Sequence, residues 1–570
     1  MRLSCTALFL WLSLLPAWAQ DWSENSELPG QERCFNSHGH RVCLRDGHRA
    51  NILNLNQNTL RKYIIKGSAH ALNYPVDISE LQLPVKAMEK FFNADSNSAL
   101  RRFIFKISKK FAPFKNFEDL FNWVGLHDYP KTTLEKGPNL IADMGELEEY
   151  PMGVSVKNFN HAQAMTFSCA ACHSQDLFGT KVLGLSNRFP RANEVFILGQ
   201  KALLASNSLL FQILIGPSAD DMEIYKNSRH AIKFVGLKEP QTLGLDTSLA
   251  QVGLSLAKRA DDSYATRSRF VRERKSPLAK VPADSKPAVW WNLKYKTKWL
   301  SDASIDSGNP VHTNFLWNEI GRGVDLKKLE NWLEVNKKTI DELTAYVFNT
   351  KAPQFNDFFP EKIDIVKAKR GEKIFLNSCK GCHGIYEKGW GQENSHELDY
   401  EKLIATTKVW YHKKTIVKDV GTDPYRHQGM TYFYKDLNKL KISQSIGTRV
   451  VPKKGYVPPP LVGIWARWPY FHNNSAPTLY DVITPAKSRA KTYIAVPSQD
   501  KELDFDKQKN GYPSAEYIRE PYKSDSEYFF NSNKKGMSNK GHETMLLDEN
   551  GREKLSHQDK LDLIEFLQTL

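Results

Sequence analysis

The chain has 570 residues, a formal net charge of +15 and 41% hydrophobic residues. This length and composition support packed domains and argue against a wholly disordered protein. A basic surface of this kind can attract an acidic partner, such as a small redox protein. Because no block of lysine and arginine is interleaved with aromatic residues, the sequence gives no sign of nucleic-acid binding.

The first 19 residues have the pattern of a secretory signal peptide. Arg2 supplies the positive start, residues 8–15 are apolar, and Ala17 and Ala19 are the small residues expected before a cleavage site. The apolar run is too short to span a bilayer, and no later stretch approaches that length. We therefore expect residues 1–19 to be removed, and the mature chain to be periplasmic or secreted without a transmembrane segment.

Two cysteines lie close together in the segment CFNSHGHRVC, which spans residues 34–43. In an oxidising compartment Cys34 and Cys43 can close a short disulfide loop. Two free thiols, or a metal site that includes His38 and His40, are the alternatives. We predict the disulfide and place it in an N-terminal arm at residues 20–60.

Four further cysteines occupy two copies of Cys-x-x-Cys-His, in SCAACHS from Ser168 and in SCKGCHG from Ser378. This is the attachment sequence of c-type haem, in which each thiol adds across a vinyl group and the histidine binds the iron. One match is expected by chance in roughly 0.002 chains of this composition. A structural zinc site needs four ligands at a different spacing, and a thioredoxin-like pair does not require the histidine.

The two motifs therefore predict two covalently attached c-type haems. In each motif the two thiols hold the haem, and the histidine that follows them is the proximal iron ligand. The residues predicted for these roles are Cys169, Cys172, His173, Cys379, Cys382 and His383.

Helical patterns precede the second motif and close the chain. An apolar face recurs through residues 365–375, which lead into the motif. Near the C-terminus Ser556 precedes Asp559 by three residues, as in a capping box, and an amphipathic run follows. Such a pair of helices resembles the crossed terminal helices of a cytochrome c domain. More than 170 residues separate His383 from Ser556, so this domain would carry a large insertion.

The insertion contains the segment VPPPLVGIWARWPYFHNNSAPTLYDVITPAKSR, which begins at Val457. It resembles a signature of the bacterial di-haem cytochrome c peroxidase superfamily, whose members include di-haem peroxidases and secreted rubber oxygenases. Asn474 stands where glycine is more usual in that family. The matching residues are Leu461, Gly463, Ala466, Pro469, Tyr470, His472, Asn473, Ser475, Pro477, Thr478, Leu479 and Arg489.

Two more segments, VGTDPYR from Val420 and MSNKGHE from Met537, are similar to the rubber-oxygenase-like branch. That resemblance implies a distal histidine for the C-terminal haem from the Gly-His-Glu segment, which here is His542. A surface position for His542 is the alternative, and His472 is a competing ligand. No residue near the first motif is an equally strong candidate, which implies an open iron position at the haem of His173.

The segment at residues 286–323, between the motifs, is rich in tryptophan and other aromatic residues. The superfamily resemblance implies a tryptophan between the haems, and Trp291 is our candidate for this electron bridge, with core packing as the alternative. Glu319 is a candidate acid/base for breaking a bound peroxide. Phe315 is a candidate for the wall of a dry pocket that would favour dioxygen and an apolar substrate.

Sparse strand signals and these motifs predict a mainly α fold with two cytochrome c-like haem domains, at residues 61–355 and 356–570. Our first functional hypothesis is an exported di-haem oxidoreductase that activates peroxide or dioxygen at the N-terminal haem. The C-terminal haem would relay electrons from a small redox protein, and the substrate could be an apolar organic molecule. The alternative is a di-haem electron-transfer cytochrome without catalysis. Length and the tryptophan-rich segment favour the enzyme, and peroxidase and oxygenase remain open.

Overall fold

The computed structural model describes residue 22 and residues 25–37, 39–74, 77–92, 114–267, 273–360 and 363–570. The predicted signal peptide lies outside these residues. Within them the chain is mixed but mostly helical, which agrees with the mainly α prediction. No helix in these ranges is both long enough and apolar enough to cross a membrane.

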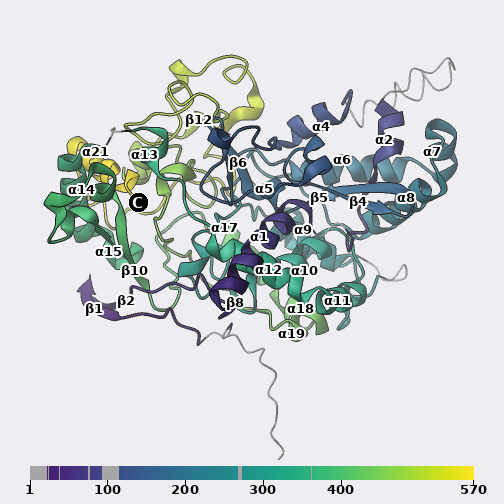
Figure 1. Cartoon of the computed structure of the whole chain (residues 1–570), viewed down its shortest axis with the longest axis horizontal. Coiled ribbons are helices and arrows are strands. Elements are labelled where there is room, and N and C mark those ends of the chain that lie inside the picture. Colours follow the sequence, from purple (N-terminus) through teal and green to yellow (C-terminus); the bar gives the residue numbers. More distant parts are fainter. Residues whose placement is uncertain are drawn as a thin grey trace, which may run out of the picture.

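Helices follow one another along the chain and are joined by long irregular segments (Figure 1). Their bounds are α1 Gln57–Asn73, α2 Val85–Phe92, α4 Phe117–Val124, α5 Ala170–His173, α6 Ala192–Ala205, α7 Ser208–Ile215, α8 Ala219–Ala231, α9 Ser248–Ala257, α10 Pro310–Gly321, α11 Leu326–Val335, α12 Lys337–Asn349, α13 Phe355–Phe358, α14 Ile365–Ser378, α15 Lys380–His383, α16 Tyr400–Ile404, α17 Tyr425–Gly429, α18 Tyr434–Asn438, α19 Lys441–Ser445, α20 Leu479–Val482 and α21 His557–Gln568.

The strands form small antiparallel sheets. One sheet has the order β1-β2-β10-β9, another has the order β3-β5-β4, and the pairs β6-β7, β8-β11 and β12-β13 stand alone. The strand bounds are β1 Glu32–Ser37, β2 His40–Arg45, β3 Leu83–Pro84, β4 Val154–Phe159, β5 Ala162–Phe167, β6 Ser174–Leu177, β7 Thr180–Leu183, β8 Ile305–Ser307, β9 Ile385–Lys388, β10 Thr406–His412, β11 Arg449–Val450, β12 Thr492–Ile494 and β13 Phe529–Asn531.

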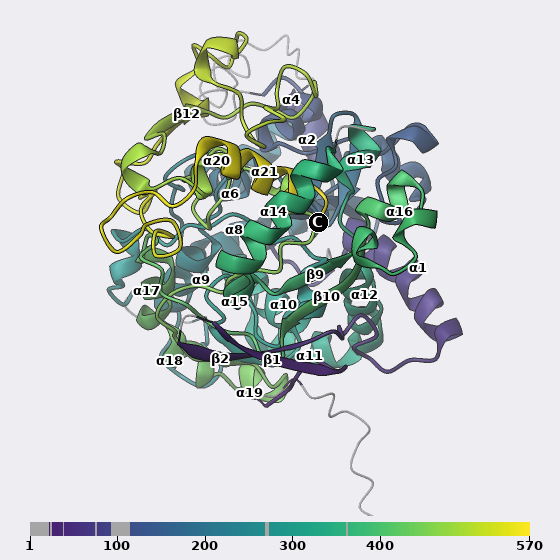
Figure 2. The same ribbon diagram turned by 90° about the vertical axis from the view of Figure 1, so that its left-hand side faces the viewer.

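The N-terminal arm is a hairpin that joins the C-terminal half of the chain. Cys34 and Cys43 are register partners in β1 and β2, and a disulfide links them. Strand β2 continues the sheet by pairing with β10, where Leu44 is opposite His412. Figure 2 shows β1 and β2 running beside β9 and β10. The predicted disulfide therefore closes the hairpin that covers this edge of the molecule.

The two helices predicted around the second motif are confirmed, and so is the predicted capping box of the C-terminal one. The Asp364 side chain accepts backbone hydrogen bonds at the start of α14, and Ser556 and Asp559 form the capping box of α21. The helices cross at Gly371, where a Cβ atom would collide with the carbonyl oxygen of Asp562. Figure 1 shows this pair at one end of the molecule, with α7 and α8 at the other.

Two large hydrophobic cores organise the chain. The first core contains the buried faces of α1, α9, α10, α11 and α12, and Cys169 packs against it. The second core contains the buried faces of α14 and α21, and Cys379 packs against it. Residues 430–450 join the first core, and Trp291 joins the second. The chain therefore passes between the two cores more than once.

The signature segment contains a turn at Asn474, which has a φ of +60°. Glycine adopts this left-handed conformation most readily, and asparagine is among the residues that tolerate it best. The Asn474 side chain also donates a hydrogen bond to the carbonyl of Gly244 at 3.1 Å. The departure from the family's usual glycine is therefore compatible with the same turn.

Candidate haem-binding site

The first Cys-x-x-Cys-His motif forms a single helical turn after strand β5. The His173 amide donates to the Cys169 carbonyl at 3.2 Å, which closes the turn. The amide of Asn187 donates to the Cys172 carbonyl at 3.0 Å, and its side chain donates to Ala171 at 2.9 Å. The α5 turn therefore places both thiols and the imidazole at fixed positions along one wall of a cavity.

The second motif continues the axis of α14 into the short turn α15. The Cys379 amide donates to Phe375 at 2.8 Å, and the His383 amide donates to Cys379 at 3.0 Å. Gly384, with a φ of +85°, ends the turn. The Nδ1 atom of His383 lies 2.9 Å from the carbonyl oxygen of Pro459. A hydrogen bond of this kind fixes the tautomer and leaves Nε2 available to a metal.

Both motifs line one cavity of about 970 Å³. This volume is near the upper end of small-molecule sites, which span about 300–1,000 Å³. Burial lowers the pKa of His173 to about 4, so its imidazole is neutral and able to bind a metal. Burial also raises the pKa of Cys379 to about 12, and this thiol packs against apolar side chains. The donors and the apolar surroundings fit covalently held c-type haem.

His542 faces His383 across the cavity. Their ring centres are 6.2 Å apart, with 61° between the ring planes. A metal–imidazole bond is about 2 Å long, so two imidazoles on opposite sides of one metal have ring centres about 6 Å apart. The Nδ1 atom of His542 lies 3.3 Å from the Val482 carbonyl, and both histidines line the cavity. The pair is therefore spaced to hold one iron atom between them.

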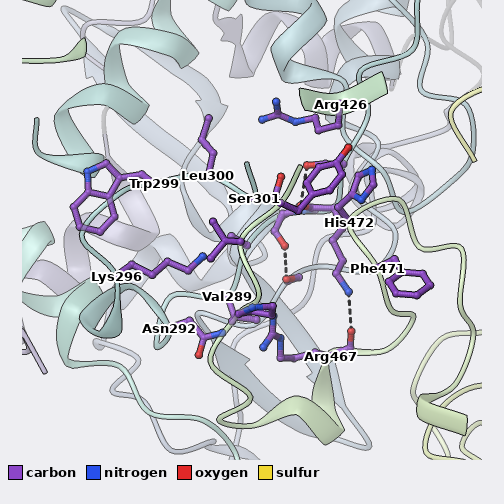
Figure 3. A pocket seen from close by; sticks show the side chains of 18 of the residues that line it. Val289, Asn292, Lys296, Trp299, Leu300, Ser301, Arg426, Arg467, Phe471 and His472 are labelled. Carbon is purple, nitrogen blue, oxygen red and sulfur yellow. Dashed lines mark hydrogen bonds between the residues drawn. The ribbon is translucent and has the colours of Figure 1, made fainter. Parts of the chain in front are cut away.

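The competing histidine lies in a different environment. His472 is stacked on Tyr456, with ring centres 4.0 Å apart and 20° between the planes. Its Nε2 atom is buried without a hydrogen-bond partner among the described residues. His472 lines the cavity, and Figure 3 shows it beside Phe471 and near Arg426. It is the adjacent Phe471, not His472, whose ring packs against His542.

Helices α9 and α10 complete the wall next to the first motif. The Arg322 side chain, just after α10, donates to the carbonyl of Phe167 at 2.9 Å, two residues before Cys169. None of the described residues by which these two helices line the cavity is a histidine, cysteine, methionine or lysine. These lining residues are Ser248, Leu249, Gln251, Val252, Pro310, Val311, Thr313, Asn314, Phe315, Trp317, Asn318 and Gly321.

Phe315, the sequence candidate for the wall of a dry pocket, lines the cavity in α10. Its ring meets Tyr74 edge-on at 5.4 Å and Trp332 at 5.6 Å, and 3% of the residue is exposed. These contacts hold the ring in one position. The result is an apolar surface beside the first motif.

Glu319 does not line the cavity. Its Oε1 atom accepts a hydrogen bond from Arg322 at 3.0 Å, and its Oε2 atom is buried without a partner among the described residues. Burial raises the pKa of Glu319 to about 7. Arg322 lines the cavity, so the carboxyl group can reach the site only through that guanidinium.

Trp291 and its neighbour Trp290 have different surroundings. The Trp291 indole is fully buried in the second core and donates to the Val462 carbonyl at 2.9 Å. Trp290 lines the cavity, and its ring centre is 5.1 Å from that of His173. The tryptophan in contact with the first proximal histidine is therefore Trp290, which the sequence did not single out. Their adjacency in the sequence could not show which indole faces the motif.

Charged side chains between the motifs were also not predicted. Four basic side chains line the same cavity, namely Lys286, Lys296, Arg426 and Arg467. Figure 3 shows the last three around one part of it. Their spacing in the sequence carries no recognisable signal, because they come from separate segments. The structure brings them together.

Comparison with known proteins identifies one short region. Residues 455–494 match a family described as RoxA-like, cytochrome c-like. This stretch contains the whole signature that begins at Val457, and it includes Arg467 and His472. A cytochrome c-like domain implies at least one c-type haem, and the similarity points to an oxidoreductase.

Two curated proteins of Sinorhizobium fredii (strain NBRC 101917 / NGR234) are distant homologues. The uncharacterized protein y4iM is 26% identical over 226 residues, which cover 37% of this chain and 50% of that protein. The uncharacterized protein y4iJ is 26% identical over 260 residues, which cover 36% of this chain and 39% of that protein. The chain thus spans half or less of the length of these relatives.

Proposed function

We propose that the chain is an exported di-haem c-type oxidoreductase. The first haem would be held by Cys169, Cys172 and His173, and would activate dioxygen or peroxide. The second haem would be held by Cys379 and Cys382, and would relay electrons to the first. The Cys34–Cys43 disulfide supports a periplasmic or secreted location, since disulfides persist in oxidising compartments.

The observation that carries this proposal is the difference between the two motifs. At the second motif, His542 is spaced to complete the coordination of an iron held by His383. At the first motif, the described wall from α9 and α10 offers no strong iron ligand. A haem with one vacant axial position supplies an iron on which an oxidant binds directly. A haem with two histidine ligands is suited to electron transfer.

The protein groups at the first motif have separate tasks in this proposal. Trp290 packs against His173 and restrains the orientation of the imidazole. Val311 and Phe315 exclude water from the apolar part of the wall. Arg322 directs a hydrogen-bond donor group and a positive charge toward the cavity, and Glu319 holds this guanidinium in place.

Dioxygen with an apolar substrate fits the described wall better than peroxide. Peroxide cleavage benefits from an acid/base that moves a proton between the two oxygens. The α9 and α10 wall contributes no carboxylate, because Glu319 lies behind Arg322. Asp246, which lines the cavity just before α9, accepts a hydrogen bond from the Ser248 amide. The peroxidase remains the second candidate, since Glu319 has a pKa raised by burial to about 7 and contacts a residue of the wall.

Carbon monoxide binding tests the proposal, because this ligand needs an open position on ferrous haem. We expect about one carbon monoxide per two haems in the reduced protein. Cys169→Ala/Cys172→Ala should abolish this binding, because it removes the attachment of the first haem, and His542→Gly should add a second site. Two haems that both exclude carbon monoxide in every redox state would instead indicate an electron carrier.

Turnover then separates the two enzyme candidates. Oxygen uptake that depends on an apolar polyene would select the oxygenase. Oxidation of a reduced cytochrome by peroxide would select the peroxidase. Phe315→Ala should lower polyene-dependent oxygen uptake more than carbon monoxide binding, because the ring lines the wall without offering an iron ligand.

A further inference from the structure

A set of buried cations lines the cavity between the two motifs. Lys296 is 9% exposed, and its ammonium group forms no ion pair with the described residues. The Arg467 guanidinium donates to the Pro460 carbonyl at 3.1 Å. Lys286 donates only to the carbonyls of Arg467 and Pro469. Two of these three basic side chains therefore donate to backbone carbonyls, and the third faces the cavity. A buried basic side chain is usually paired with a carboxylate instead.

Two neutral hydrogen-bonding groups share this wall. The Ser301 hydroxyl and the Nε2 atom of His472 are both buried, and neither has a partner among the described residues. Both residues line the cavity together with Lys296 and Arg467 (Figure 3). The stacking of His472 on Tyr456 fixes the direction of its ring. Buried polar atoms are almost always hydrogen-bonded, so these groups indicate a polar ligand in the cavity.

The acidic residues in the described lining do not neutralise these cations. Asp246 accepts a hydrogen bond from the Ser248 amide at 2.6 Å, and Asp419 forms an ion pair with Lys454 at 3.1 Å. Asp302 does not line the cavity and is paired with Arg426, 3.3 Å away. Burial, followed by the positive charge of Arg467, lowers the pKa of Lys296 to about 8. Because buried charges are normally paired, the basic residues of this cavity wall are suited to bind an anionic group.

The cation wall is connected to both motifs. The Nδ1 atom of His383 lies within hydrogen-bonding distance of the Pro459 carbonyl oxygen. Arg467 donates a hydrogen bond to the carbonyl of the next residue, Pro460. The backbone amide of Lys286 donates to the carbonyl of His472 at 2.9 Å, and four residues later Trp290 packs against His173. The same two segments therefore position the proximal histidines and the cations.

We propose that Lys296, Arg467, Ser301 and His472 form a shared cradle for the propionate carboxylates of the two haems. This inference rests on the proposal that both motifs carry haem. The thiols of each motif hold the vinyl edge of the ring, and the propionates leave from the opposite edge. The propionates must therefore lie away from the cysteines and inside the same cavity. The cradle lies in the same cavity as both motifs and supplies the positive charge that carboxylates need.

The shared cradle has a consequence for electron transfer. A positive charge near an iron stabilises its ferrous state, so the cradle would raise the reduction potential of each haem that it contacts. Because the same cations would serve both haems, a change at one residue would alter both potentials. A role in packing alone would alter stability and leave the potentials unchanged.

The test is an anaerobic potentiometric titration of the haem-loaded full chain, after its haem content has been measured by mass. We expect Lys296→Met to lower the midpoint potentials of both haems, and Lys296→Arg to restore them. Lys294→Met is the matched control, because Lys294 is also largely buried but donates to Thr350 and does not line the cavity. Unchanged midpoints in Lys296→Met, with full haem content, would overturn the cradle.

A second variant keeps the test decisive if Lys296→Met does not accumulate with haem. Ser301→Ala removes one hydroxyl and should shift the vibrational band of the propionates. An unchanged band would also overturn the proposal. Neither measurement requires carbon monoxide or substrate, so failure of the enzyme proposal would leave this result interpretable. A mass showing fewer than two haems would instead reject the di-haem assignment.

Discussion

His542 has an unusual backbone conformation for a histidine. Its φ is +59°, and the preceding Gly541 has a φ of +89°. A non-glycine residue in this region costs of order 1 kcal/mol and persists where the surroundings fix it. The His542 amide donates to the Val420 carbonyl at 2.8 Å, which anchors the turn to the segment VGTDPYR. The two segments that resemble the rubber-oxygenase-like branch thus meet, and together they aim this imidazole at His383.

Replacing His542 by glycine should open the second haem. Glycine tolerates the left-handed backbone, so the turn should survive while the imidazole is lost. We expect one low-spin iron to become five-coordinate or water-bound, with the other iron unchanged, as measured by absorption and electron paramagnetic resonance. His472→Gly is the control. If that variant changes the spin state and His542→Gly does not, the ligand has been misassigned.

Several site residues could be predicted from the sequence because their signal is local. The spacing of Cys-x-x-Cys-His is a requirement of the attachment chemistry, and Gly-His-Glu is a short contiguous segment. Trp290 and Lys296 have no such signal. Their role depends on which side of an irregular segment faces the cavity, and tertiary packing decides that.

Glu319 should make stability depend on pH. Its pKa is raised by burial to about 7 in the folded chain, from a reference value of 4.5. Between these values the unfolded chain loses the proton first, so stability falls as pH rises from about 4.5 to about 7. The full effect is about 3 kcal/mol at most.

Thermal unfolding at pH 5 and at pH 7.5 checks this expectation. Glu319→Gln cannot ionise and should lose less stability across that interval than the native chain does. Glu527→Gln, at an exposed ion pair with Arg191, is the control and should behave like the native chain. Equal pH dependence in Glu319→Gln and the native chain would contradict the assignment.

At the scale of elements, helices with local signals were predictable and long-range strand pairs were not. The apolar face of α14 and the capping box of α21 each depend on residues that are close together in the sequence, and both are confirmed. Strand β2 pairs with β10, whose residues lie more than 350 positions later in the chain. No local pattern in either strand specifies its partner. The sequence therefore could not show that the N-terminal arm closes over the second motif.

Gly371→Ala tests the crossing of α14 and α21. In a helix this substitution normally stabilises by about 0.5–1 kcal/mol. Here the added Cβ would collide with the carbonyl of Asp562 and separate the helices, so we expect a loss of about 1–3 kcal/mol in chemical denaturation. Gly199→Ala, in α6 with open space around it, should stabilise. Similar effects of the two substitutions would argue against the close crossing.

At the scale of the whole molecule, the cavity connects the two cores. Side chains of both cores line it, including Leu249 and Phe315 of the first core and Phe375 and Leu563 of the second. A group held in this cavity would therefore contact both cores, and its loss would expose apolar surface of each.

Removing the attachment thiols of one motif should weaken mainly the core beside it. In Cys379→Ala/Cys382→Ala we expect new proteolytic cleavage within residues 363–570, and in Cys169→Ala/Cys172→Ala we expect it around α9 and α10. Limited proteolysis with mass spectrometry distinguishes these patterns. Denaturation of the native chain should release no haem, because the thioethers are covalent. Protection equal to that of the native chain in both variants would show that the fold does not need the attached groups.

The position of the β1–β2 hairpin in the chain also determines when it can pair with the rest of its sheet. Its disulfide spans nine positions and can form as soon as the arm is exported, because the pairing is local. Its partner β10 follows the second motif in the chain, so the finished hairpin has nowhere to dock until that motif is already in place. Ser37 then packs against Gly381, between the two thiols. The first part of the chain to be made therefore waits for a strand more than 350 positions later before it can close this edge beside the second motif.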